Sequence, residues 1–360
     1  MRQTERTKLT IKVGTPREVS RAAGNHWFPT MLYRLHDDSL LLGYSVCEDA
    51  IPCNVAAGMP HALLKSPDNG LNWFLLNVWN GSYYNEALPI GVLPDGRVLG
   101  TAHSTALQNE KGEPYLLDYV SHDHARSWEG PHVTPVHFPE GLLKPDVNLH
   151  PGRTLAPVSF EGNVLALADN RLVRIADPMF KEDRFTRVCL MESLDEGKSW
   201  SYVATIADQD DAPLHFNESA LVELEEGHLL CVMRTDLDPE RPHPMYQAHS
   251  TDGGRTWSAP KPCGFNGVRP ALVKMQNGVI ACSYGRLSGW PSQGVQVMFS
   301  LDGGESWTQP APIYHAASTG YTCMIEARPG ELLLCYDVLG SGWTRDNAIM
   351  AARIAVGRKL

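Results

Sequence analysis

The chain has 360 residues, of which 43% are hydrophobic and 20% are charged, and its formal net charge at pH 7 is −10. It contains no basic run and no apolar stretch near the roughly 18 residues of a membrane-spanning helix, so we expect neither a nucleic-acid nor a membrane partner. The first residues lack the apolar core of a signal peptide. This favours a cytoplasmic protein, or a secreted or periplasmic one if a leader precedes this sequence.

Six short turns, each flanked by apolar residues, follow one another along the chain. They lie at residues 35–38, 93–96, 160–162, 224–227, 275–278 and 327–330. Two of them are Asp-Gly and Asn-Gly turns between apolar runs, the strongest short-range signal for a β-hairpin. After the sixth turn, residues 347–356 alternate as a strand does, and we expect residues 9–13 to add a strand to the same sheet.

A second motif, Ser-x-Asp-x-Gly-x-Ser/Thr-Trp, alternates with these turns. We call it the box, and its five copies begin at Ser66, Ser121, Ser193, Ser250 and Ser300. The first copy has Asn72 at the Ser/Thr position, and the second has Ala125 in place of Gly. The Asp can bind backbone amides of its own turn, and the Gly supplies a positive φ. We expect a structural turn whose Trp packs on the neighbouring hairpin; a calcium or sugar site in each turn is the alternative.

Two hairpins per repeat and six repeats predict six four-stranded sheets. Packed radially, such sheets form an all-β, six-bladed β-propeller, and we expect residues 1–360 to form one domain of this kind.

The eight cysteines do not suggest a disulfide framework. Cys231, Cys282 and Cys335 occupy the same position in successive repeats, where each is expected to be packed inside its sheet. Cys47 and Cys53 lie close together in a loop, and a disulfide between them is an open alternative. Because no Cys-x-x-Cys motif or His/Cys cluster is present, we expect no metal and no cofactor.

Polar residues gather where the inner strand of each predicted blade begins and where the second strand ends. These positions meet at one mouth of a propeller. They include Trp27, Asp49, His103, Glu218, Arg234, Arg269, Arg286, Tyr321 and Asp337. Carboxylates, arginines and a tyrosine around one axis suit an enzyme that acts on an anionic sugar, whose carboxylate an arginine can bind bidentately. Alternatively, Arg234 and Arg286 are ion-pair partners of Glu218 or Asp236, Tyr321 is a packing residue, and His103 and His150 are loop residues.

The boxes and the blade count resemble those of the sialidase superfamily over essentially the whole chain. Sialidases use a Tyr nucleophile assisted by a Glu, an Asp acid/base and three arginines for the substrate carboxylate. Residues 217–234 resemble the segment with the assisting Glu and the second arginine, which implies these roles for Glu218 and Arg234. The resemblance also implies that Tyr321 is the nucleophile, that Arg286 is the third arginine, and that Asp49, or else Glu48, is the acid/base.

The sequence departs from this family at the start of the first blade. Where the family has Phe-Arg-Ile-Pro, this chain has His26-Trp27-Phe28-Pro29, so that Trp27 stands in place of the first arginine. A Trp suits stacking on a pyranose ring but cannot bind a carboxylate. We therefore expect a substrate other than ordinary sialic acid, such as a uronic acid or another acidic sugar, and expect Arg234, Arg269, Arg286, His103 and Asp337 to bind it.

Three functions remain open from the sequence. The first is a retaining glycoside hydrolase with Tyr321, Glu218 and Asp49 as catalytic residues. The second is a polysaccharide lyase, in which His103, His150 or Tyr321 removes the proton next to a uronate carboxylate. The third is a non-catalytic propeller that binds a carbohydrate or a protein.

Overall fold

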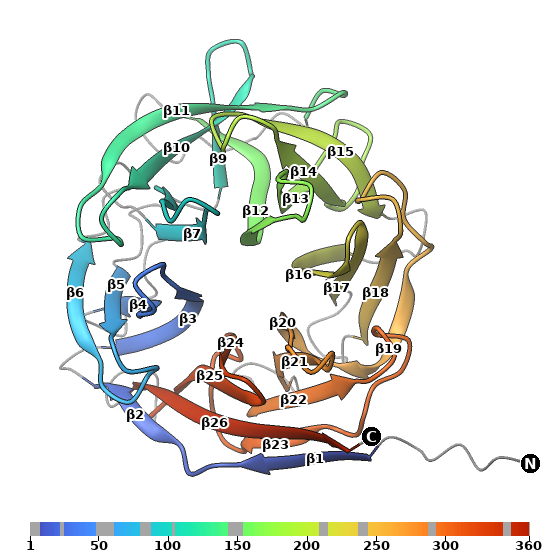
Figure 1. The fold of residues 1–360 in the computed structure, drawn as a ribbon. Helices are drawn as coiled ribbons and strands as arrows, with labels where there is room; N and C mark the ends of the chain where they lie inside the picture. The colour runs from blue at the N-terminus through green and yellow to red at the C-terminus, as the bar shows by residue number, and fades with distance from the viewer. Residues whose placement is uncertain are drawn as a thin grey trace, which may run out of the picture.

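The described part of the computed structural model is built from β-strands arranged in a ring (Figure 1). It comprises residues 8–21, 25–47, 61–79, 88–102, 105–142, 154–208, 215–236, 244–286, 293–340 and 347–359. No helix in these ranges is long and apolar enough to cross a membrane.

Three four-stranded sheets follow the order of the chain. The first contains β3 (Asn25–Arg34), β4 (Leu40–Cys47), β5 (His61–Ser66) and β6 (Phe74–Trp79). The second contains β16 (His215–Glu225), β17 (His228–Asp236), β18 (Pro244–Ser250) and β19 (Lys261–Asn266). The third contains β20 (Val268–Lys274), β21 (Ile280–Gly285), β22 (Val295–Ser300) and β23 (Ala311–Tyr314). Each is an antiparallel meander, as two linked hairpins dictate.

A fourth sheet joins the two ends of the described chain. It contains β24 (Thr322–Arg328), β25 (Glu331–Val338), β26 (Ala348–Lys359), β1 (Lys8–Val13) and β2 (Arg17–Ser20). The predicted N-terminal strand is therefore confirmed: β1 pairs with β26 from Lys8 opposite Lys359 to Val13 opposite Ile354. β2 pairs with the other half of the same edge of β26.

The second and third repeats form one nine-stranded sheet rather than two separate ones. It contains β7 (Leu88–Val92), β8 (Val98–Thr101), β9 (Thr105–Gln108), β10 (Pro114–Ser121), β11 (Glu129–His137), β12 (Thr154–Ala166), β13 (Leu172–Pro178), β14 (Val188–Ser193) and β15 (Trp200–Ala207). The short strand β9 pairs with both β10 and β12, and β11 pairs with β15. These extra pairings merge the two repeats, so hydrogen bonding alone does not establish the predicted count of six blades.

The five boxes form turns with one shared set of hydrogen bonds. In each, the Ser hydroxyl and a backbone amide four residues after the Asp donate to the same Asp oxygen. The other Asp oxygen accepts from the side chain at that fourth position. Both oxygens of each Asp are thus occupied by donors of the turn itself. The box Trp residues join the hydrophobic clusters between strands.

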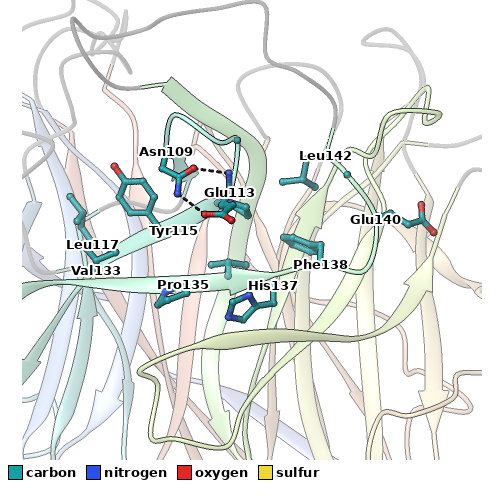
Figure 2. A pocket seen from close by; sticks show the side chains of 14 residues that line it. Asn109, Glu113, Tyr115, Leu117, Val133, Pro135, His137, Phe138, Glu140 and Leu142 are labelled. Atoms are coloured by element: carbon teal, nitrogen blue, oxygen red, sulfur yellow. Dashed lines mark hydrogen bonds between the residues drawn. The ribbon is translucent and has the colours of Figure 1, made fainter.

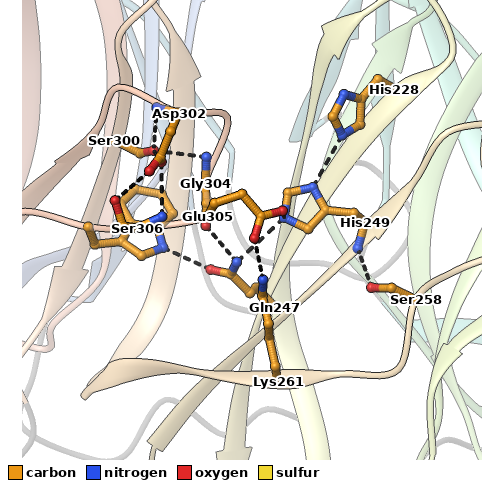
Figure 3. Close-up of polar contacts among 11 residues, drawn as sticks. His228, Gln247, His249, Ser258, Lys261, Ser300, Asp302, Gly304, Glu305 and Ser306 are labelled. Atoms are coloured by element: carbon orange, nitrogen blue, oxygen red, sulfur yellow. Dashed lines mark hydrogen bonds and ion pairs between the residues drawn. The ribbon is translucent and has the colours of Figure 1, made fainter. Parts of the chain in front are cut away.

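Several boxes are also bound by the preceding repeat. In the last box, the Gln247 amide donates to the Gly304 carbonyl at 2.6 Å and accepts from Trp307 Nε1 at 2.8 Å (Figure 3). Arg171 donates to the Gly253 carbonyl at 2.9 Å, and Arg97 pairs with Glu196 at 2.9 Å. These contacts connect neighbouring repeats.

The three cysteines of the shared repeat position are fully buried, as predicted: Cys231, Cys282 and Cys335 are each 0% exposed. The Cys47–Cys53 pairing lies outside the described residues.

The strands nearest the ring centre begin with bulges in a strained conformation. Phe28 on β3, Glu218 on β16 and Arg269 on β20 have φ values of 50°, 31° and 48°. The pairing register with the next strand shifts across each of them. Bulges re-aim side chains, and a non-glycine residue at positive φ persists only where its surroundings enforce it. These three side chains therefore mark the site.

Candidate active site

Tyr321 and Glu218 are hydrogen-bonded to each other although 103 residues separate them in the sequence. The phenol of Tyr321, which directly precedes β24, donates to Glu218 Oε1. Arg234 Nη1 donates to the other oxygen, Oε2, at 2.5 Å. The Glu218 side chain is only 12% exposed. A carboxylate that accepts from a phenol is placed to take the phenolic proton.

Arg234 is held by a second carboxylate. Its Nε and Nη2 atoms lie 3.1 and 3.0 Å from Asp236 Oδ1, and the Asn217 amide donates to Asp236 Oδ2 at 2.7 Å. Burial disfavours the charged form of Arg234, but the charges of Glu218 and Asp236 outweigh it and raise the Arg234 pKa. Arg234 is thus ion-paired with both Glu218 and Asp236, which is the alternative that the sequence left open for this residue.

Two of the bulged residues contact the ring of Tyr321. The Phe28 ring meets it edge-on, with centroids 4.8 Å apart and an interplanar angle of 81°. The Arg269 guanidinium carbon lies 5.2 Å from the Tyr321 ring centroid, which is a cation–π distance. With Glu218, all three bulged side chains contact Tyr321.

The segment before Tyr321 is anchored by Asp337 on β25. Asp337 is 0% exposed and accepts from the hydroxyls of Ser318 and Thr319 and from the Thr319 amide. Burial raises the Asp337 pKa to about 6, although the hydrogen bonds from Thr319 and Ser318 oppose this rise. Because its carboxylate is fully buried, the expectation that Asp337 binds the substrate directly is corrected: it binds the loop that carries Tyr321.

Two of the remaining predicted residues lie in or next to strands, and the others lie outside the described part of the chain. Arg286 is exposed just after β21, where its backbone bonds to Gly294 and Gln293. Trp27 lies in β3 opposite Ser45, and its side chain is outside the described part. Asp49, Glu48, His103 and His150 also lie outside it. Their roles remain predictions.

Sequence reasoning missed the roles of Phe28 and of the Ser318–Thr319 pair. A signal for Phe28 was available, because Phe28-Pro29 and Arg269-Pro270 are matching dipeptides at the start of inner strands. Proline removes a hydrogen-bond donor from the ladder and is therefore found in strands at edges and bulges.

One cavity lined by described residues borders the nine-stranded sheet. It measures about 820 Å³ and is bordered by Tyr115, Val133, His137, Phe138 and Leu142 at the edge of the nine-stranded sheet (Figure 2). None of the predicted site residues borders it. Within the described ranges, no group of three or more His, Cys, Asp or Glu side chains could hold a metal ion.

The sequence matches the family model described as a BNR repeat-like domain over residues 101–332. The chain therefore belongs to this family of repeat proteins. No curated protein matches the sequence.

Solved structures show the same fold at low sequence identity. A protein of unknown function from Dyadobacter fermentans has a TM-score of 0.74 and 19% identity, covering 96% of this chain and 99% of its own. The Hadza microbial sialidase Hz136 has a TM-score of 0.68 and 17% identity, covering 94% and 68%. The GH93 α-L-arabinofuranosidase of Fusarium graminearum, in complex with arabinobiose, has a TM-score of 0.63 and 16% identity, covering 95% and 98%. The predicted resemblance to the sialidase superfamily is thereby confirmed at the level of repeat family and fold.

Proposed function

We propose that the protein is a glycoside hydrolase with a sialidase-like fold, in which Tyr321 is the nucleophile and Glu218 its base. The observation that carries this proposal is the hydrogen bond from the Tyr321 phenol to the buried Glu218 carboxylate, with Arg234 on the other oxygen. A phenol is a weak nucleophile until a base removes its proton. Similarity to sialidases and to an arabinofuranosidase supports the reaction class.

In the first step, the Tyr321 oxygen attacks the anomeric carbon while its proton passes to Glu218. The bond between that carbon and the leaving oxygen breaks, and an acid protonates the leaving group. We propose Asp49 for this acid, on the resemblance alone. In the second step, Asp49 takes a proton from water and the water oxygen attacks the anomeric carbon. The bond between that carbon and the Tyr321 oxygen breaks, and the proton on Glu218 returns to the departing phenolate oxygen. Two displacements retain the configuration.

Arg234 and Arg269 have distinct proposed roles. Arg234 keeps Glu218 oriented toward the phenol and balances its charge. Arg269 lies beside the Tyr321 ring, where a cation stabilises negative charge that develops on the phenolic oxygen during proton transfer. Arg286 and His103 are proposed substrate contacts at the same mouth.

We propose an acidic or otherwise non-standard glycan as the substrate, rather than ordinary sialic acid. Trp27 replaces the first arginine of the sialidase pattern, and each of the three guanidinium nitrogens of Arg234 already contacts Glu218 or Asp236. Neutral sugars belong in the same screen, because the Fusarium structure contains arabinobiose.

We also propose that the nine-stranded sheet comprises the second and third blades of a six-bladed propeller that spans residues 1–360. One set of four strands consists of β7, β8, β10 and β11, and the other consists of β12, β13, β14 and β15. Each set thus has the same number of strands as the four-stranded sheets. Tyr321, Glu218, Arg269 and Phe28 would then meet at its axis.

A product screen tests the proposed reaction. The protein is incubated with sialosides, uronate-containing oligosaccharides and neutral aryl glycosides, including arabinofuranosides, beside Tyr321→Phe as the matched control. Release of a saturated sugar by the wild type alone supports the hydrolase. An unsaturated product that absorbs short-wavelength ultraviolet light would indicate a lyase, and binding without turnover would indicate a carbohydrate-binding propeller.

A further inference from the structure

We propose that Asp337 is a positioning residue that fixes the loop before Tyr321 and thereby holds the phenol on Glu218. This inference rests on the proposed function of Tyr321. Asp337 itself is buried and does not touch the reacting atoms; it acts through the loop.

The Asp337 carboxylate serves as the acceptor around which the loop folds. Oδ1 accepts from the Ser318 hydroxyl at 2.9 Å, the Thr319 hydroxyl at 2.8 Å and the Thr319 amide at 3.2 Å. The Thr319 amide also lies 3.3 Å from Oδ2. Ser318 Oγ in turn accepts from the Gly320 amide at 3.0 Å, and Thr319 Oγ1 accepts from the Tyr321 amide at 3.3 Å. An unbroken set of bonds therefore leads from Asp337 to the backbone of Tyr321.

The loop has little room to relax in another direction. Gly320 has a φ of 86°, which favours glycine. A Cβ built on Gly285 of β21 would lie 2.4 Å from the Gly320 Cα, so these two backbones are in close contact. Just beyond Tyr321, the Thr322 hydroxyl bonds to Ser283 Oγ at 2.8 Å. The loop is thus fixed between β21 and β25, and among the hydrogen bonds described here Asp337 is its one ionisable anchor.

The chemistry at Asp337 is unusual for a residue that serves stability alone. Its hydrogen-bond partners are hydroxyls and amides, with no cation among those the structure describes. The titratable group that responds to its charge is Tyr314 on β23, whose pKa is raised by burial and then by Asp337. A buried carboxylate without a cation costs stability. A position that carries this cost, and that is hydrogen-bonded to the loop preceding Tyr321, is one where a strong multiple acceptor serves function.

The test compares Asp337→Ala and Asp337→Asn with a matched control elsewhere. Asn retains an oxygen at the Oδ1 position, while Ala removes every acceptor. The control is Asp118→Asn, because Asp118 on β10 is also buried, its pKa is also raised by burial, and threonine hydroxyls also bond to it. Asp118 lies in the nine-stranded sheet, far from the Tyr321 loop in the chain.

Two readouts are taken on each folded variant. Hydrogen exchange of the peptide covering residues 316–322 measures the order of the loop without any substrate. Crystal structures measure the distance from Tyr321 Oη to Glu218 Oε1. We expect Asp337→Ala to speed exchange at least about tenfold and to break the contact with Glu218, whereas Asp337→Asn and Asp118→Asn preserve both. Unchanged exchange and an unchanged contact in Asp337→Ala would overturn the inference, whatever the enzyme's activity.

Kinetics then test the consequence for turnover. With a substrate from the screen, we expect Asp337→Ala to lower kcat roughly 10- to 100-fold with little change in KM, and Asp337→Asn to recover most of it. An equal loss of kcat in Asp118→Asn would show that the effect comes from a general loss of stability. It would refute the positioning role of Asp337. If the wild type hydrolyses no glycoside, the proposed function fails, and the exchange and crystallographic results still decide whether Asp337 holds Tyr321.

Discussion

The buried carboxylate of Asp337 predicts a specific pH dependence of stability. Its pKa is raised from the ordinary value of 3.8 to about 6, chiefly by burial. The folded protein therefore favours the protonated form of the Asp337 carboxyl more than the unfolded chain does. The stabilisation from this preference is fully present below pH 3.8 and is lost as the pH rises through about 6. Ionisation at neutral pH consequently costs folding free energy.

Asp337→Asn removes this ionisation while keeping the shape of the side chain. The shift from 3.8 to about 6 corresponds to about 3 kcal/mol, at about 1.4 kcal/mol per pKa unit. We expect the stability of Asp337→Asn relative to the wild type to increase by about this amount between pH 4 and pH 7.5, which is roughly 4 °C in Tm for a chain of this length.

Thermal and urea unfolding of both proteins at several pH values measure this difference. A gap that stays constant from pH 4 to pH 7.5, or that closes as the pH rises, would refute the reasoning. Tyr314→Phe in both backgrounds provides the control, because Tyr314 is the titratable neighbour that responds to the Asp337 charge.

Four further substitutions test other parts of the structure. Glu218→Gln removes the base and one partner of Arg234, so we expect turnover of a glycoside to fall at least about 100-fold while circular dichroism is unchanged. Phe28→Ala removes the edge-on ring contact with Tyr321, which is worth about 1 kcal/mol, and a kcat within twofold of the wild type would contradict its role at the site. Asp302→Ala deletes the acceptor of the last box and should lower the free energy of unfolding by about 2 kcal/mol with kcat unchanged. Gln247→Ala should destabilise by about 1–3 kcal/mol by leaving Trp307 Nε1 without its acceptor, as urea unfolding would measure.

The sequence predicted the local structure well because that structure is encoded by short repeats. Each box contains both the Asp acceptor and its donors within a few residues, and five of the six predicted hairpin turns lie between two strands. The turn predicted at residues 160–162 was wrong: these residues lie inside β12, and the hairpin of that repeat turns at residues 167–171. The merging of the second and third repeats was not predicted, because β9 is a four-residue strand whose partners β10 and β12 lie in different repeats.

The candidate site was predicted only where family resemblance or residue chemistry indicated it. Tyr321, Glu218 and Arg234 meet as the resemblance implied. The role of Asp337 was misjudged, because a carboxylate at the end of a strand has the same sequence signal whether it faces a mouth or a neighbouring loop. Burial distinguishes the two cases, and burial depends on packing between repeats that are distant in the chain.

The pairing of residues 8–20 along β26 makes the N-terminal segment a cover for an exposed sheet edge. Without it, β26 would present a long row of unpaired amides and carbonyls, which is a template for pairing with another chain. We expect proteolytic trimming of this segment to lower solubility before it changes the site, because Tyr321 directly precedes β24 and Asp337 lies on β25, and neither strand pairs with β1 or β2.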